Sequence, residues 1–177
     1  MRIIAGSRKG ARIFAPKGET RPTGDRVREA AFNLIGPVEE MAVLDLFAGS
    51  GAMGLEALSR GARSAVLVES DREAQKTIER NLEKLGLKGA TLVKADARRA
   101  LAAEAAAGRR YDLVLVDPPF RMLDSLLPTL STYLPGLLAE DGLVVVETPA
   151  REHPQLVLPE RTSRKYGSVR LTVFESP

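Results

Sequence analysis

The sequence predicts an α/β fold built on a doubly wound, mostly parallel sheet, with a small N-terminal β extension and helix in front of it. Two observations support this prediction. From residue 41 onward, short continuous apolar runs alternate with helical stretches, which is typical of parallel strands covered by helices on both faces. The first of these runs also leads straight into a glycine-rich loop, the kind of connection at which such sheets bind ligands.

The N-terminal region comes before this alternation. Residues 1–22 contain two brief apolar stretches around a basic turn with glycine, which predicts a short β arm. Thr23 is a good N-cap residue, and apolar residues recur at helical spacing after it until Gly36-Pro37 ends the helix. We therefore expect two domains, an arm with its helix over residues 1–37 and an α/β domain over residues 38–177.

The expected elements of the α/β domain follow from the apolar runs and from the helical spacing between them. The strands are expected at residues 43–47, 65–69, 90–94, 111–116, 143–147, 157–158 and 169–174. The helices are expected at residues 55–60, 71–85, 97–107 and, with a proline inside it, 122–133.

The composition excludes several classes of chemistry. The chain contains no cysteine, which rules out disulfides, iron–sulfur clusters, thiolate zinc sites and a cysteine nucleophile. His153 is the single histidine, so a multi-histidine metal site is excluded and we expect no metal. No run approaches the ~18 apolar residues that cross a bilayer, and the N-terminus lacks the apolar core of a signal peptide. We therefore expect a cytoplasmic protein with no membrane partner.

The charge is unevenly distributed along the chain, although the formal net charge is only +3. Residues 1–30 hold eight basic and three acidic side chains, whereas residues 31–150 hold 13 basic and 17 acidic ones. Residues 151–177 hold five basic and three acidic side chains. Basic ends around an acidic centre favour a polyanionic partner. A solvated surface on which the charges cluster by chance is the alternative.

A glycine loop follows the first expected strand. Gly49, Gly51 and Gly54 have G-x-G-x-x-G spacing between a strand and a helix, which is the context of nucleotide-type cofactor sites. Glu69 ends the second expected strand, 20 residues beyond Gly49, where a carboxylate can accept hydrogen bonds from both ribose hydroxyls. The pattern also fits an NAD-dependent oxidoreductase, and a plain strand–turn–helix connection is a further alternative.

Asp45 favours a different cofactor. It lies in the strand just before the loop, where a carboxylate would repel a pyrophosphate. It suits a cationic ligand such as S-adenosylmethionine, whose ammonium group needs a carboxylate partner. Asp96 follows the third expected strand and is positioned to accept a hydrogen bond from an adenine amino group. A role as N-cap of the next helix explains Asp96 equally well.

The most specific motif is Asp117-Pro118-Pro119-Phe120, at the carboxyl end of the fourth expected strand. An exocyclic base amine is a poor nucleophile because its lone pair is delocalised into the ring. Hydrogen bonds from the amine to the Asp117 carboxylate and the Pro118 carbonyl would aim that lone pair outward, and the prolines would hold both acceptors in place. The ring of Phe120 offers a stacking face for the base. The motif predicts direct methyl transfer to a base amine, with a rigid Pro-Pro turn as the alternative.

These motifs together resemble the bacterial methyltransferases that modify N2 of a guanine in 16S ribosomal RNA. The matching segments are Met1–Gly6, Arg21–Glu29, Asp45–Leu58, Val68-Glu69, Asp117–Phe120 and Lys165–Gly167, so the resemblance runs nearly from end to end. It implies a Rossmann-like class I methyltransferase fold and S-adenosylmethionine as the methyl donor. It also implies 16S rRNA of the small ribosomal subunit as the substrate.

The resemblance further implies roles for individual residues. The implied catalytic residues are Asp117, Pro118, Pro119 and Phe120. The residues implied to line the cofactor site are Asp45, Phe47, Gly49, Ser50, Gly51, Glu69, Asp96, Thr23 and Arg26. The basic arm would bind the RNA backbone through Arg2, Arg8, Lys9, Arg12 and Lys17. For the helix after Thr23, the alternative to a binding role is a surface helix with an Arg28 ion pair.

The Asp-Pro-Pro-Phe motif does not by itself identify the base, because adenine N6 presents the same chemical problem. A DNA adenine methyltransferase is therefore the nearest alternative, although such an enzyme ordinarily needs a separate domain to read a duplex and flip the base. An NAD-dependent oxidoreductase would leave Asp117 without a function. A non-catalytic ribosome-assembly factor would keep the basic arm but would not need an intact motif. We predict guanine-N2 methylation of 16S rRNA.

Overall fold

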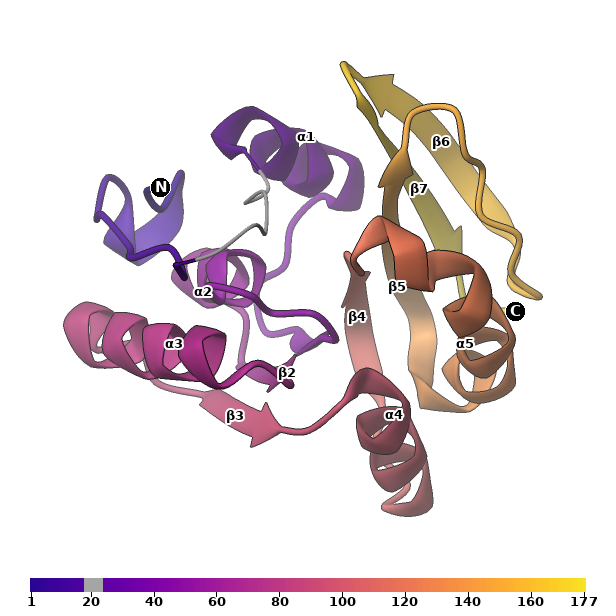
Figure 1. The fold of residues 1–177 in the computed structure, drawn as a ribbon, viewed down its shortest axis with the longest axis horizontal. Coiled ribbons are helices and arrows are strands. Elements are labelled where there is room, and N and C mark those ends of the chain that lie inside the picture. Colours follow the sequence, from indigo (N-terminus) through magenta and orange to yellow (C-terminus); the bar gives the residue numbers. More distant parts are fainter. Residues whose placement is uncertain (18–23) are drawn as a thin grey trace.

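The computed structural model describes residues 1–17 and 24–177, and a seven-stranded sheet runs through them (Figure 1). In chain order its strands are β1 (Ala42–Asp45), β2 (Ser64–Glu69), β3 (Ala90–Lys94), β4 (Tyr111–Val116), β5 (Leu138–Pro149), β6 (Glu160–Tyr166) and β7 (Val169–Glu175). The first five strands are parallel to one another, and β7 is antiparallel to its neighbours β5 and β6. The predicted doubly wound, mostly parallel sheet is confirmed.

The direction of winding reverses between β1 and β4. The strands lie in the order β3-β2-β1-β4-β5-β7-β6, so the chain moves outward from β1 and then returns to the middle of the sheet for β4. Sheets of this kind bind ligands at the carboxyl ends of the two strands that flank the reversal. Because β1 pairs with β4, with Asp45 opposite Leu115, the glycine loop and the Asp-Pro-Pro-Phe loop leave neighbouring strands at this point.

Helices cover both faces of the sheet (Figure 1). They are α1 (Asp25–Ile35), α2 (Ala52–Ser59), α3 (Arg72–Leu85), α4 (Ala97–Ala106) and α5 (Leu123–Leu137). Buried side chains of α1, α2 and α3 share one hydrophobic cluster with β1, β2 and β4, and those of α4 and α5 share a second one. The side chains of Leu113–Val116 in β4 contribute to the two clusters in alternation, which is why this part of the strand is continuously apolar.

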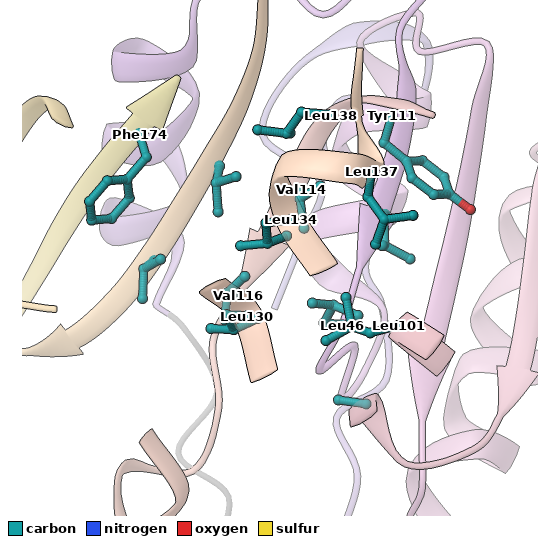
Figure 2. Packing of buried hydrophobic residues seen from close by; sticks show 14 of the residues in the cluster. Leu46, Leu101, Tyr111, Val114, Val116, Leu130, Leu134, Leu137, Leu138 and Phe174 are labelled. Atoms are coloured by element: carbon teal, nitrogen blue, oxygen red, sulfur yellow. The ribbon is translucent and has the colours of Figure 1, made fainter. Parts of the chain in front are cut away.

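The packing of α5 shows how the second face is filled. Leu130, Leu134 and Leu137 of this helix are fully buried and lie close to Val114 and Val116 of β4 (Figure 2). Their spacing of three to four residues places them on one side of the helix. The helix runs four residues past the predicted end at residue 133 and tolerates two internal prolines.

The N-terminal arm, residues 1–17, folds back beside α2 and α3 (Figure 1). A single β-bridge joins Arg2 to Arg12, and a 3-10 helix, η1 (Gly6–Arg8), occupies the turn between them. The predicted β extension is therefore present only as this one bridge.

Apolar contacts and one close backbone approach hold the arm in place. Ile3 and Ile13 are buried in a third hydrophobic cluster together with Leu55 of α2 and Leu85 of α3. Gly6 has a φ of +81°, and a Cβ at this position would lie 1.8 Å from the Ser59 carbonyl oxygen at the end of α2. A side chain at residue 6 would therefore push the arm away from the helix.

The carboxylate of Glu56 lies at the centre of the contact between the arm and α2. Its side chain is fully buried, yet both oxygens have partners: Oε2 accepts from the Ile4 backbone N–H at 2.8 Å and Oε1 accepts from that of Ala5 at 2.9 Å. Nε of Arg60 donates to Oε1 at 2.8 Å. Glu56 therefore fastens the backbone of the arm to α2 with hydrogen bonds to a charged acceptor, which are stronger than those to a neutral one.

Arg28 of α1 supplies the balancing charge from the other side. Its side chain is also fully buried, with Nε 3.7 Å from Oε2 of Glu56. Nη2 donates to Oδ1 of Asp25 at 2.8 Å and to the Arg2 carbonyl. The alternative of a surface ion pair at Arg28 is therefore wrong, because this guanidinium joins α1, α2 and the arm inside the protein.

Several boundaries differ from the predicted ones, and the differences at β6 and α1 have a clear reason. Residues 157–158 form no strand, and the hairpin partner of β7 is β6, at residues 160–166. β6 lies at the edge of the sheet, and its residues are mostly polar, so it lacks the apolar pattern that predicts a buried strand. Helix α1 begins at Asp25 with Gly24 in the N-cap position, whereas the predicted N-cap, Thr23, lies outside the described residues.

We predict that Glu56→Gln destabilises the protein by about 3–5 kcal/mol, because the change leaves the Arg28 guanidinium buried without its full counter-charge. Urea unfolding measures this loss. The control is Glu73→Gln, which removes an exposed ion pair to Lys76 and should cost at most about 1 kcal/mol. Equal losses in the two variants would contradict a structural role for the buried pair.

Candidate active site

The glycine loop connects β1 to α2 at the carboxyl edge of the sheet. Gly49 and Gly51 have φ angles of +57° and +81°, in the left-handed region that only glycine adopts without strain. A Cβ at Gly49 would meet no atom within 4 Å, so the backbone here borders open space. A ligand can therefore approach the main chain of the loop closely.

Gly54 has a different function from the two glycines before it. A Cβ at this position would lie 2.1 Å from Cδ2 of Leu67 on β2. The absence of a side chain lets the first turn of α2 pack directly against the sheet, which is the role of the third glycine in this spacing. The helix N-terminus is thereby held at the end of β1.

The Asp45 carboxyl group is almost completely buried, with a residue exposure of 2%. Its Oδ2 accepts a hydrogen bond from the Gly54 backbone N–H at 3.1 Å, so it fastens the first turn of α2. Burial raises the pKa of Asp45 to about 7, and the negative charges of Asp117 and Glu69 add to the rise, while hydrogen bonds from the Gly54 and Phe47 backbone oppose it. Three carboxyl groups thus lie near one another at this edge.

Glu69 links the glycine loop to the start of α3. Its Oε2 accepts from the Gly49 backbone N–H and its Oε1 from that of Asp71, both at 2.8 Å. The sequence predicts that this carboxylate accepts hydrogen bonds from ribose hydroxyls. In the structure it accepts hydrogen bonds from main-chain N–H groups. Each carboxylate oxygen has a further lone pair, so Glu69 can still accept a hydrogen bond from a ligand that lies against Gly49.

The Asp-Pro-Pro-Phe motif begins directly after β4. Asp117 is half-buried, Pro118 is buried, and Pro119 is exposed. Phe120 starts a short 3-10 helix, η2 (Phe120–Met122), and half of its surface is exposed to solvent. The motif therefore places an acidic side chain next to the glycine loop and an accessible aromatic ring beyond it.

Other predicted cofactor residues lie around the same loop or at its border. Phe47 is half-buried and Ser50 is buried. Asp96 is the N-cap of α4, with Oδ1 accepting from the Arg99 backbone N–H at 3.0 Å, so the capping explanation is confirmed. Its predicted hydrogen bond to an adenine stays a prediction.

The structure does not bring all predicted binding residues together. Arg26 is exposed on α1, and Thr23 lies outside the described residues. In the arm, Arg2 is 3.6 Å from Asp25, and Nε of Arg8 donates to the Leu85 carbonyl at 2.6 Å. All five predicted RNA contacts of the arm are exposed to solvent, Lys9, Arg12 and Lys17 as well as Arg2 and Arg8.

Asn81 is a supporting residue that the sequence did not reveal. It is fully buried in α3, and its Nδ2 donates to the carbonyls of Ser50 at 2.9 Å and Phe14 at 3.0 Å. Its Oδ1 accepts from the Phe14 backbone N–H at 2.7 Å. One amide therefore joins the arm to the glycine loop, and a lone asparagine in an amphipathic helix carries no signal of such a role.

The convergence of acidic groups tests which cofactor fits. Asp45, Glu69 and Asp117 lie near one another at the loop, and the charges of Asp117 and Glu69 add to the rise in the pKa of Asp45 that burial causes. A cationic ligand would relieve the repulsion, whereas a pyrophosphate would increase it. The described residues hold no group of three or more side chains that could bind a metal ion, and none of their helices is long and apolar enough to cross a membrane.

A glycine loop and an Asp-Pro-Pro-Phe loop on neighbouring strands, in a sheet of the order β3-β2-β1-β4-β5-β7-β6, define a Rossmann-like class I methyltransferase. The chain belongs to the protein family described as Conserved hypothetical protein 95, which it matches over residues 1–175. This match includes the arm, the glycine loop and the Asp-Pro-Pro-Phe motif.

Similar proteins agree with this assignment. The chain is 40% identical over 183 aligned positions to the "Putative rRNA methyltransferase YlbH" of Bacillus subtilis, with 99% of this chain and 98% of that protein covered. It is 41% identical over 152 positions to the "Ribosomal RNA small subunit methyltransferase D" of Escherichia coli K12, covering 84% and 74%. A solved structure of a hypothetical protein from Thermus thermophilus superposes with a TM-score of 0.87 at 36% identity, covering 99% of each chain.

The raised pKa of Asp45 predicts a pH-dependent stability. Between about pH 4 and pH 7 the folded state retains a proton that the unfolded chain, with an ordinary pKa of 3.8, has released. The free energy of unfolding therefore falls as the pH rises through this range and levels off above it.

Asp45→Asn should remove the contribution of Asp45 to this pH dependence. That contribution is a difference of at most roughly 4 kcal/mol in the free energy of unfolding between the two ends of the pH range. Urea unfolding at a series of pH values checks it. Asp124→Asn, at an exposed residue of α5, is the control and should leave the slope as it is. An unchanged slope in Asp45→Asn would show that the group is ionised in the folded protein.

Proposed function

We propose that this protein transfers a methyl group from S-adenosylmethionine to the exocyclic N2 amine of a guanine in 16S rRNA of the small ribosomal subunit. One observation carries the proposal. The glycine loop, with acidic side chains around it, follows β1, and the Asp-Pro-Pro-Phe loop follows the paired neighbouring strand β4, so the two loops lie side by side. The names of relatives at 40% and 41% identity support ribosomal RNA, and small-subunit RNA in particular, as the substrate.

The cofactor would occupy the edge of the sheet at the glycine loop. When bound, S-adenosylmethionine supplies an electrophilic methyl group on a positively charged sulfur. Asp45 and the carboxylates near it favour that cation, and Gly49 leaves the backbone open to it. Glu69 would accept hydrogen bonds from the ribose hydroxyls and Asp96 from the adenine amino group. The implied lining roles of Phe47, Ser50, Gly51, Thr23 and Arg26 are part of this proposal.

The target base would lie against the Asp-Pro-Pro-Phe loop. Asp117 and the Pro118 carbonyl accept hydrogen bonds from the exocyclic amine and orient its lone pair toward the donor site. Pro118 and Pro119 restrict the backbone, so the acceptors need little reorganisation. Phe120, half exposed at the start of η2, stacks on the base, a contact worth ~1–3 kcal/mol.

The two predicted domains would have different functions. Residues 1–37 would contact the RNA backbone through exposed basic side chains, and residues 38–177 would carry the cofactor and the chemistry. Assembly of the small ribosomal subunit takes place in the bacterial cytoplasm, so this function would place the protein there.

The assignment is tested with small subunits from a strain that lacks the enzyme. They are incubated with the protein and S-adenosylmethionine labelled in the methyl group, and the modified nucleotide is mapped. Label on guanine N2 of 16S rRNA is the expected result. Label on DNA adenine instead, or binding of a nicotinamide cofactor without any transfer, would overturn the proposal in favour of one of the alternatives.

Asp117→Ala should lower kcat for methyl transfer by at least about 100-fold, because the amine loses a preorganised acceptor. The affinity for S-adenosylmethionine, measured by calorimetry, should stay within a small factor of the wild-type value. Loss of folding or of cofactor binding in this variant would contradict a role at the base. Asp124→Asn again serves as the control for a surface carboxylate.

The exposed arm residues should contribute to the electrostatic part of RNA binding. Changing Lys9, Arg12 and Lys17 together to alanine should weaken binding to 16S rRNA and reduce the slope of log Kd against log salt by roughly 2, because each phosphate that is no longer neutralised lowers the slope by about 0.7. Filter binding over a range of salt concentrations measures the slope. If the slope does not change, the RNA backbone binds to another part of the protein and not to these arm residues.

A further inference from the structure

An exposed aromatic ring on the arm has no role in the site described above. The large apolar side chains exposed among the described residues are Phe14, Phe120 and Val157. Phe120 belongs to the Asp-Pro-Pro-Phe motif, and Val157 stands alone before β6. Phe14 is different because basic side chains of α3 surround it.

The contacts of Phe14 form a small, open site. The guanidinium carbon of Arg80 lies 4.0 Å from the centroid of the Phe14 ring, and Nζ of Lys84 lies 4.8 Å from it. These three side chains and Glu83 line a hollow of about 400 Å³ on the surface. The hollow thus combines a planar apolar face, two positive charges and one carboxylate.

The position of the ring is set by the main chain. The Phe14 N–H and carbonyl are both bonded to the side-chain amide of Asn81, at 2.7 and 3.0 Å. Asn81 is fully buried, so the two bonds hold the main chain of residue 14 beside α3, where its ring contacts Arg80 and Lys84. A partly exposed aromatic side chain beside two cations is suited to a planar ligand that carries negative charge.

A nucleotide of single-stranded RNA has this chemistry. Its base stacks on an aromatic ring or a guanidinium plane, and its phosphate attracts lysine and arginine. Glu83 can accept a hydrogen bond from a base amino group. Arg80 and Lys84 lie eight and twelve residues beyond the start of α3 at Arg72, roughly 12–18 Å along the helix from the carboxyl edge of the sheet. The ligand would therefore be a nucleotide other than the methylated one.

We propose that Phe14, Arg80 and Lys84 form a second RNA-binding site that takes one unpaired nucleotide of the substrate, with the base on Phe14 and the phosphate on the two basic side chains. This inference rests on the proposed function, because it assumes an RNA substrate. It assigns the outer face of α3 to RNA recognition, in addition to the predicted basic residues of the arm.

The chain contains no tryptophan, so a single introduced tryptophan reports on its own surroundings. In the full-length Phe14→Trp variant, a short single-stranded RNA of mixed sequence should quench the fluorescence, because a base stacks on the indole. Val157→Trp is the matched control, at another exposed apolar position, and should show no quenching at the same RNA concentrations. Equal quenching in both variants, or none in either, would overturn the proposal.

Affinity measurements separate stacking from charge. Phe14→Leu should weaken binding of the same RNA roughly 5- to 150-fold without changing the salt slope, and Phe14→Trp should retain the wild-type affinity.

Changing Arg80 and Lys84 together to glutamine should reduce the slope of log Kd against log salt by roughly 1. Changing Arg109 and Arg110 to glutamine removes the same charge just before β4, away from Phe14, and should have a smaller effect. Equal effects of the two double variants, or wild-type affinity in a folded Phe14→Leu protein, would contradict a specific site.

The two proposals fail in different ways. If the protein methylates 16S rRNA but RNA leaves the fluorescence of the Phe14→Trp variant unchanged, the nucleotide site is wrong and the proposed function stands. If RNA quenches that fluorescence but no methyl group is transferred to small subunits, the proposed function is wrong and the nucleotide site stands.

Discussion

The buried ion pair of Glu56 and Arg28 is the contact on which the N-terminal part of the structure depends. Neither side chain is exposed, and the burial of two charges is costly unless their mutual attraction and their hydrogen bonds compensate for the lost hydration. The backbone N–H groups of Ile4 and Ala5 and the side chain of Arg60 satisfy Glu56. The donors and acceptors of this pair come from α1, α2 and the arm, so all three elements are held in one arrangement behind the glycine loop.

Asn81 makes a second connection between the arm and the loop, and it does so without charge. Its amide reaches Phe14 on one side and the Ser50 carbonyl on the other. The arm is thus bound to α2 through Ile4 and Ala5, near the start of the chain, and to α3 through Phe14. Asn81 therefore supports both the proposed RNA-binding site at Phe14 and the proposed cofactor loop at Ser50. A shift in the position of one segment would change the hydrogen bonds that hold the other.

Local patterns were sufficient for most of the fold. The strands β1 and β4 and the central part of β5 are largely buried, so their apolar runs could be recognised without knowledge of their neighbours. β6 was missed because an edge strand with polar residues lacks this pattern. The glycine loop and the Asp-Pro-Pro-Phe loop were placed correctly at the ends of β1 and β4 because motif and strand are contiguous in the chain. The partners of Arg28, Glu56 and Asn81 lie up to 67 residues away, and no local pattern marks them.

The sequence by itself therefore determined the class of fold, the two loops at the carboxyl edge and the residue types that each loop presents. These features depend on periodicity and on short motifs, which are properties of neighbouring residues. Only the tertiary structure decided which charged side chains are buried, that Asp45 is bonded to Gly54, and that Phe14 lies against Arg80 and Lys84. The reason is physical: burial and the electrostatic surroundings of a group are set by atoms that the chain brings from distant positions, and a linear pattern contains no record of them.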